Sequence, residues 1–459
     1  MFRIESGSTG SYCDGLSRRS FLQLGVAGMA SVGLGGVMKA QAASVAKGVS
    51  RKDTSVILVW LDGGPGHMDM YDMKPEAPPE YRGLWSPIRT NVKGIEITEL
   101  FPRQAKIADK FSIIRSLHHD NGDHFTAAHL FLTGRGGANG SDTTQKYPGI
   151  SAIASKLAGP RRKGLPAHIA VPYSSTVGLR PGYFAGNYIG KEGDPFETNG
   201  DPNAASFQVQ NLTLNSTMSI QRLDDRRAIM RQLDRARREA DTTGMMNSMD
   251  QFEQKAFDLV TSEEARKAFD IGNESPVVRE SYGRNGWGQS CLLAARLAEA
   301  GATFITVHMG GWDHHWDLKK GYDNYLPKLD VALSGLFDDL VRRGIYEKTL
   351  VVVCGEFSRT PKMNDGGNGG APGSMGTPGR DHWGNAMFCL MGGGGVQGGR
   401  IVGSTNRLGE HPQDRPLTPN DVHHTIYHVL GVNPNVSFLN HAGRPVPVVD
   451  DGAVIGELF

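Results

Sequence analysis

Short, almost uninterrupted apolar runs recur along the chain, and they constrain its fold more than any other feature. The runs cover residues 56–61, 111–114, 169–171, 303–307, 350–354 and 386–390. Apolar residues without alternation are typical of strands that are covered on both faces. Helical patterns at 149–157, 289–300 and 325–343 lie between these runs. This alternation predicts an α/β fold built on an open, mostly parallel sheet.

The segment 219–270 has a different character. It is highly charged, with pairs such as Arg226-Arg227 and Arg237-Arg238, and its apolar residues are spaced apart. A charge run of this kind is usually the solvated face of a helix. We therefore expect two surface helices that form a helical cap or insertion beside the sheet, and we assign them no chemistry.

An export signal stands near the start of the chain. Arg18-Arg19 precede Phe21-Leu22 and a mildly apolar stretch, the pattern of a twin-arginine leader. The stretch 22–38 contains five glycines, whereas a membrane span needs ~20 predominantly apolar residues. A small-x-small cleavage signal follows at 40–42. We expect a signal peptide over 1–42, a mature domain over 43–459 and a periplasmic or extracellular location; an uncut N-terminal anchor is the alternative.

The composition narrows the class further. The chain has 49 Lys and Arg against 48 Asp and Glu, a net charge of +1, which argues against a nucleic-acid partner. No second apolar run is long enough to give a stable membrane span after cleavage. Cys354 and Cys389 lie in apolar, strand-like runs, which favours buried free thiols. Cys13 lies in the predicted leader, so with Cys291 three cysteines remain in the mature chain. Three cysteines do not make a disulfide framework, and one disulfide is the alternative.

Acids and histidines concentrate in short segments that follow the apolar runs. These segments are 62–72, 118–124, 311–315 and 356–361, and a fifth at 380–383 precedes a run. Loops that follow parallel strands emerge at one edge of the sheet, where ligands bind. The side chains expected to converge there are those of Asp62, His124, Asp313, His315 and Glu356.

This mixture of carboxylates and imidazoles is suited to Zn²⁺ or Mn²⁺. Such an ion can polarise a phosphoryl or sulfuryl oxygen and lower the pKa of a bound water. Arg359 could hold an anionic group through two parallel hydrogen bonds, and His67 or His124 could assist with protons. Each residue also has a structural interpretation, since turns and helix caps use the same side chains.

Three histidines of the helical pattern 419–430 form a second group, which we interpret differently. Val422, Ile426 and Val429 make the apolar face of this helix. His424 and His428 fall on the opposite, exposed face. We therefore do not expect His423, His424 and His428 to bind a metal together.

Several of these motifs together resemble an exported family known as domain of unknown function 1501. The segments that carry the resemblance are 63–75, 356–361, 379–383 and 443–446. The resemblance covers roughly 56–459. That family is similar to the alkaline phosphatase and sulfatase superfamily, which implies a doubly wound, alkaline-phosphatase-like sheet with helices on both faces and a two-metal site.

The resemblance also implies a ligand set. The superfamily's first aspartate would be Asp62, its mid-chain pair would be Asp313 and His315, and its final histidine would be His382. Glu356 would stand for the aspartate of a later pair, with a phenylalanine in place of the histidine. The implied metal ligands are thus Asp62, Asp313, His315, Glu356 and His382.

The nucleophile position departs from the superfamily pattern. Residues 123–134 look like the region that follows the superfamily's nucleophile, yet no Ser, Thr or Cys occupies the position before it; the nearest candidates are Asp120 and Asn121. The sulfatase formylglycine signature is absent. A metal-activated water or a carboxylate would have to take the nucleophile's place.

These observations predict an exported, metal-dependent hydrolase of phosphate or sulfate esters. Its substrate would be a small anionic ester or a sulfated or phosphorylated glycan. The alternative is a binding protein for anions or glycans on the same scaffold, without turnover. A third possibility is a structural partner in an extracytoplasmic complex that uses the 219–270 helices.

Overall fold

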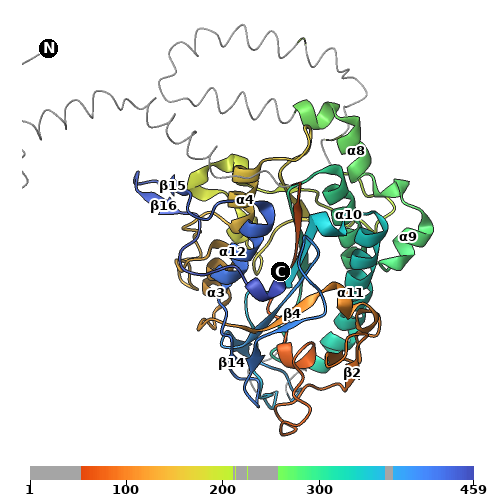
Figure 1. Cartoon of the computed structure of the whole chain (residues 1–459), viewed down its shortest axis with the longest axis vertical. Helices are drawn as coiled ribbons and strands as arrows, with labels where there is room; N and C mark the ends of the chain where they lie inside the picture. Colours follow the sequence, from red (N-terminus) through yellow and green to blue (C-terminus); the bar gives the residue numbers. More distant parts are fainter. Residues whose placement is uncertain (1–52, 210–211, 213–224, 226–256, 367–375) are drawn as a thin grey trace, which may run out of the picture. The chain divides into compact units, whose positions relative to one another are not determined.

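A sheet of eight strands, counted over the described residues, lies at the centre of this computed structural model (Figure 1). The structure describes residues 53–209, 212, 225, 257–366 and 376–459. The predicted signal peptide and most of the predicted 219–270 insertion therefore lie outside the described residues. The strand order is β12-β4-β11-β8-β1-β7-β5-β6. The strands are β1 Ser55–Asp62, β4 Ser112–Leu117, β5 His168–Val171, β6 Phe196–Glu197, β7 Phe304–Gly310, β8 Thr349–Cys354, β11 Met387–Gly392 and β12 Ile401–Val402.

Most neighbouring strands in this sheet are parallel, which confirms the predicted fold class. The central strand β1 pairs in parallel with β7 on one side and β8 on the other. The strand β11 is the exception, because it runs antiparallel to both β4 and β8. All eight residues of β1 are buried. Burial on both faces explains why its sequence is apolar without alternation.

Two groups of helices cover the two faces of the sheet (Figure 1). The first group is α8 Glu263–Phe269, α9 Pro276–Ser281, α10 Gly286–Ala300 and α11 Leu318–Arg342. The second group is α3 His124–Thr133, α4 Ile150–Ala158 and α12 Pro419–Leu430. From the first group α10 packs on β7 and β1, and from the second α4 packs on β7 and β5 while α12 packs on β1. Of the predicted insertion, the structure describes residues 225 and 257–270, which include α8.

Smaller elements surround the sheet. Short antiparallel pairs are formed by β2 Pro87–Arg89 with β3 Glu96–Thr98, β9 Ser358–Arg359 with β10 His382–Trp383, β13 Ser404–Thr405 with β14 Pro412–Asp414, and β15 Ser437–Leu439 with β16 Pro445–Pro447. The 3₁₀ turns are η1 His67–Asp69, η2 Gln104–Lys106, η3 Ala108–Lys110, η4 Gly182–Phe184, η5 Asn187–Ile189, η6 Lys191–Gly193, η7 Ile271–Asn273, η8 Tyr346–Lys348 and η9 Gly456–Leu458. The pairing of β9 with β10 places Arg359 opposite His382.

The prediction of buried free thiols is confirmed. Cys291, Cys354 and Cys389 are buried and free. On α12, His423 is buried and donates to the Phe131 carbonyl at 2.6 Å, whereas His428 is exposed and His424 half-buried. The three histidines of α12 therefore do not share one face. No helix among the described residues combines the length and apolarity needed to cross a membrane.

Candidate metal centre

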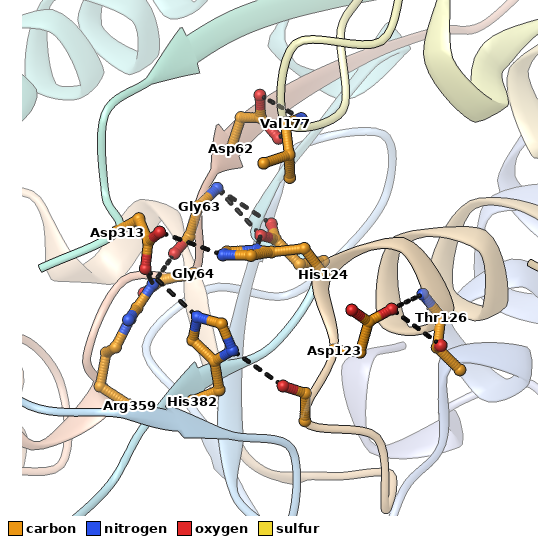
Figure 2. A network of polar contacts seen from close by, with 12 residues as sticks. Asp62, Gly63, Gly64, Asp123, His124, Thr126, Val177, Asp313, Arg359 and His382 are labelled. Atoms are coloured by element: carbon orange, nitrogen blue, oxygen red, sulfur yellow. Dashed lines mark hydrogen bonds and ion pairs between the residues drawn. The ribbon is translucent and has the colours of Figure 1, made fainter. Parts of the chain in front are cut away.

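The site lies where several strands and loops end at one edge of the sheet. Asp62 is the last residue of β1, and Asp313 follows β7. Glu356 follows β8, and His382 lies on β10. His124 begins α3, whose N-cap Asp123 accepts the Thr126 N–H at 2.9 Å. Residues that are far apart in the sequence therefore meet here (Figure 2).

Three side chains form the centre of the cluster. One ligand atom from each of His124, Asp313 and His382 lies within 4.8 Å of the other two. The Nε2 atoms of His124 and His382 each lie 3.2 Å from a carboxylate oxygen of Asp313. A fourth residue, His315, places its Nε2 atom 3.1 Å from Asp313 Oδ1 and 2.9 Å from His382 Nε2. The Nε2 atoms of three imidazole rings thus lie close to one carboxylate.

Each of the three histidines has its Nδ1 atom fixed by an oxygen of the protein. The Glu356 carboxylate lies 2.7 Å from His124 Nδ1, and the Asp381 carboxylate lies 2.7 Å from His315 Nδ1. The Gly122 carbonyl lies 2.8 Å from His382 Nδ1. Carbonyls and ionised carboxylates only accept hydrogen bonds, so each Nδ1 carries the hydrogen and each neutral ring presents its Nε2 lone pair. Histidines that bind metals in proteins are oriented in this way.

The converging lone pairs require a positive charge between them. The Nε2 atoms of His315 and His382 face each other at 2.9 Å beside the carboxylate of Asp313. The buried Nε2 of His124 has no hydrogen-bond partner, although Asp313 Oδ2 is 3.2 Å away. A proton or a metal ion resolves both situations. Nitrogen and carboxylate donors in this arrangement fit Zn²⁺ or Mn²⁺.

In the absence of a metal, protons occupy the cluster. Burial alone would lower the pKa of His124, but the carboxylates of Asp313 and Glu356 on its two sides raise it to about 9. Although burial acts to raise the pKa of Asp313, its close contacts with His124, His315 and His382 hold that pKa far below its usual range. The pKa of His315 is raised, chiefly by Asp313, and burial lowers the pKa of His382.

Glu356 lies behind this cluster. It is fully buried, and its two oxygens accept the Gly63 N–H at 3.0 and 3.1 Å. Burial raises its pKa, and the contact with His124 opposes the rise. Glu356 was predicted as a metal ligand, and the structure places it as the acceptor that orients His124.

Asp62 was also predicted as a ligand, and its carboxylate points away from the cluster toward Val177 (Figure 2). Both oxygens accept the Val177 N–H at 3.0 Å, and Oδ2 lies 3.0 Å from His308 Nε2. Asp62 is therefore outside the group formed by His124, Asp313 and His382.

Arg359 is completely buried, and its acceptors lie within the protein. Its Nε donates to the Gly64 carbonyl at 2.7 Å, and one terminal nitrogen donates to both the Gly63 carbonyl and Asp313, the latter at 2.6 Å. The turn that supplies these carbonyls requires glycine, because Gly63 and Gly64 have φ values of 112° and 77°. Arg359 thus ties this turn to Asp313.

His67 is 1 % exposed and has both ring nitrogens engaged. Its Nδ1 lies 2.6 Å from Ser358 Oγ, and its Nε2 lies 2.8 Å from the Gly409 carbonyl. Burial lowers the pKa of this imidazole. The structure therefore places His67 in a packed hydrogen-bond network beside Arg359, without a free ring nitrogen.

The contacts of two polar residues of the site, His308 and Asp381, were not predicted from the sequence. His308 contacts Asp62 from the neighbouring strand β7, and Asp381 orients His315. The pair Asp381-His382 stands out in the sequence as a polar motif between glycines. His308 directly follows an apolar run. Because β1 and β7 pair in parallel, with Asp62 opposite Gly310, His308 lies near Asp62.

A cavity of about 720 Å³ opens beside the cluster. Its lining includes Asp62, His308 and Asp313, together with Tyr173 and Trp287. Asp313 thus faces both the histidines and the cavity. A molecule in this cavity would therefore reach the cluster at Asp313.

Several solved structures resemble this chain in part. The phosphonate monoester hydrolase of Agrobacterium radiobacter is 11% identical with a TM-score of 0.40, over 88% of this chain and 77% of that one. The lipoteichoic acid synthase LtaP from Listeria monocytogenes is 11% identical with a TM-score of 0.38, over 88% and 79%. The PsFucS1 sulfatase from Pseudoalteromonas sp. is 13% identical with a TM-score of 0.35, over 86% and 71%. TM-scores of this size carry no argument about chemistry.

The sequence itself gives a more direct result. A search of curated proteins finds no match. A family model described as "Protein of unknown function (DUF1501)" matches residues 53–459. The match spans nearly all of the chain that follows the predicted leader, and it includes every candidate site residue. The chain therefore belongs to the DUF1501 family, as its motifs predicted.

Proposed function

We propose that the protein is a metal-dependent hydrolase of phosphate or sulfate esters. The observation that carries the proposal is the orientation of His124, His315 and His382. Each ring has its Nδ1 atom held by a protein oxygen, and each directs its Nε2 atom at Asp313. We assign His124, Asp313 and His382 as ligands of a divalent ion, Zn²⁺ or Mn²⁺. When bound, such an ion supplies Lewis acidity at an ester oxygen and acidifies water.

The remaining side chains have supporting roles in this proposal. Glu356 holds the His124 ring, and Arg359 holds Asp313 in place while its guanidinium stays out of contact with solvent. We therefore assign Arg359 to positioning rather than to gripping the substrate. Asp62 keeps the loop at Val177 and His308 fixed at the cavity wall.

His315 is suited to proton transfer. Its Nδ1 is held by Asp381 at 2.7 Å, and its Nε2 lies at the edge of the cluster. A carboxylate that orients an imidazole and stabilises its charged form is the arrangement used by general bases. In this proposal His315 Nε2 accepts a proton from the attacking water and later returns it to the leaving alcohol. We assign no proton transfer to His67, because both of its ring nitrogens are engaged.

The proposed location is outside the cytoplasm. The support is the Arg18-Arg19 leader and the cleavage signal that follows it. A folded domain that carries its own ion is suited to export in the folded state. The substrate would then be an anionic ester of the periplasm or the cell exterior, such as a phosphorylated or sulfated glycan.

The test combines metal analysis with an ester panel. Purified protein is analysed by inductively coupled plasma mass spectrometry and assayed on phosphate, sulfate and phosphonate monoesters with Zn²⁺ or Mn²⁺. We expect bound metal, and we expect both metal and turnover to be lost in D313A and H382A. The exposed His411 lies outside the cluster, so H411A serves as the matched control. Wild-type protein with neither metal nor turnover would refute the proposal.

A binding protein without turnover is the second candidate. It is favoured by one observation: among the described residues, no serine, threonine or cysteine side chain forms a hydrogen bond with the side chain of His124, Asp313 or His382. Asp123, at the start of α3, is occupied as the helix cap. Metal binding and ligand binding without cleavage of any ester in the panel would decide for this candidate.

A further inference from the structure

The cavity beside the cluster contains polar groups that the proposed chemistry does not use. Ser175 and Ser290 line it and are only 3 % and 2 % exposed. Neither hydroxyl makes a hydrogen bond to any residue that the structure describes. Neither oxygen is among the buried unpaired atoms of the described residues, so both hydroxyls are open to the cavity. Each can donate a hydrogen bond to a ligand there and accept one from it.

An aromatic wall lies on the same cavity. Trp287 lines it and is backed by Trp312, whose ring stacks on it at 5.5 Å between centroids and 19° between planes. Tyr325 packs against the same indole at 5.0 Å. The Trp287 ring is therefore held in one orientation. A fixed aromatic face is a platform for the C–H groups of a flat ligand ring.

One carboxylate at the cavity is largely available to a ligand. Asp201 is exposed and lines the cavity next to the start of α10, where Trp287 is located. Its Oδ1 accepts the Asn203 N–H at 2.8 Å, and Oδ2 has no partner among the described residues. Asp62 and Asp313 also line the cavity, but they are engaged by Val177, His308 and Arg359. Asp201 is thus the acceptor that remains.

The charge of the lining limits the ligand. The residues that line the cavity, all within the described part of the chain, include three aspartates and no lysine or arginine. An additional anionic substituent would be repelled there. A positively charged ligand would satisfy Asp201, but a quaternary ammonium group would leave both serine hydroxyls unpaired. A neutral ring with several hydroxyls satisfies the serines, the carboxylate and the indole face together.

We propose that this cavity, through Ser175, Ser290, Asp201 and Trp287, binds an uncharged sugar ring. This inference rests on the proposed function. The sugar would be the alcohol part of the ester that the hydrolase cleaves, and the ester group would be the only anionic group of the substrate. A volume of about 720 Å³ lies within the range of small-molecule sites, about 300–1,000 Å³. The cavity therefore selects a singly esterified neutral sugar over a densely sulfated one.

The test measures sugar binding without the reaction. Saturation-transfer NMR with EDTA present is run on the methyl glycosides of glucose, galactose, mannose and N-acetylglucosamine, with choline as the cationic alternative. We expect at least one glycoside to bind, and D201N and S290A each to weaken it about tenfold, as expected for a lost hydrogen bond to a charged or buried group. The buried Ser151 also lacks a partner but lies on α4 away from the lining, so S151A is the matched control.

The outcomes separate this inference from the proposed hydrolase. No binding of any glycoside, binding that both variants leave unchanged, or binding of choline in preference to the glycosides would each overturn the sugar site. S175A provides a second variant should S290A alter the packing of α10, and thermal melting checks the fold of each. Sugar binding in this test, together with neither metal uptake nor ester cleavage by the wild-type protein in the separate metal analysis and ester panel, would retain the sugar site and refute the hydrolase.

Discussion

The Glu356 carboxylate is important for the candidate metal centre although it is buried behind the proposed ligands. It is fully buried, it accepts the main-chain N–H of Gly63, and it fixes the His124 ring. Removing the Glu356 carboxylate would leave His124 in place but would let its imidazole ring rotate. Carboxylates that orient a ligating histidine are typically worth a factor of about 10–100 in metal affinity.

We therefore expect E356Q to bind Zn²⁺ about 10- to 100-fold more weakly than wild type. The amide has the shape of the carboxylate, so the fold is retained, but a neutral oxygen is a weaker acceptor for His124 Nδ1–H. Competition with a chromogenic chelator measures the dissociation constants. Glu347 is exposed, so E347Q is the control. Equal affinity in E356Q and wild type would remove Glu356 from the metal centre.

At the residue scale the sequence predicted the gathering of side chains better than their roles. Asp313 and His315 follow β7 at the carboxyl edge of the parallel strands. His382 reaches the same edge because it precedes β11, which runs antiparallel to its neighbours. The orientation of Asp62 could not be predicted, because its partner is a main-chain N–H of Val177, a residue with φ of 48° in a distant loop. Likewise the carbonyls that occupy Arg359 come from a glycine turn, and main-chain acceptors leave no signal in side-chain patterns.

The N-terminal cap of helix α3 lies directly beside a residue of the candidate metal centre. His124 is its first residue, and Asp123 caps it by accepting the Thr126 N–H and hydroxyl at 2.9 and 3.0 Å. At the other end Gly134 adopts a left-handed conformation with φ of 73°. The cap determines where the helix begins, and thereby the position of the His124 ring.

We expect D123A to lower the free energy of unfolding by about 1 kcal/mol, the usual cost of losing a cap. Metal affinity should fall with it, because the first turn of α3 carries His124. D123S keeps a capping oxygen and should recover most of both properties. Chemical denaturation and chelator competition measure the two effects. If D123A and D123S behave alike, the cap does not position the histidine.

Among the elements, strand existence was predictable but strand direction was not. The run 386–390 is apolar in the same way as the runs of β1 and β8, because all three are buried on both faces. Nothing in such a run distinguishes an antiparallel strand, and β11 is antiparallel to both neighbours. The short β9–β10 pair, which joins Arg359 to His382, is too small to leave a periodic pattern.

At the scale of the whole molecule, buried neutral histidines make stability depend on pH. Burial lowers the pKa of both His168 and His423 from 6.5 to about 4. The unfolded chain binds protons between these values and the folded chain does not, so stability is lost as the pH falls from about 6.5 toward 4. A shift of one pKa unit corresponds to about 1.4 kcal/mol.

We expect wild type to lose roughly 2 kcal/mol more than H423Q between pH 7 and pH 4.5. Glutamine can still donate to the Phe131 carbonyl that His423 contacts, but it does not titrate. Urea denaturation at both pH values, with metal removed, gives the difference. Parallel losses in the two proteins would mean that His423 contributes no pH dependence. His428, exposed on the same helix, provides H428Q as the control.

If the proposed ligands hold an ion, metal binding also becomes a measure of complete folding. These proposed ligands stand at positions 124, 313 and 382, so no single helix, hairpin or half of the chain contains them all. An ion held by the native state alone adds about 4 kcal/mol to global stability at a free concentration 1,000-fold above its dissociation constant. Because that contribution requires every ligand at once, a partly folded or cleaved chain loses all of it, and metal retention becomes an assay for chain integrity.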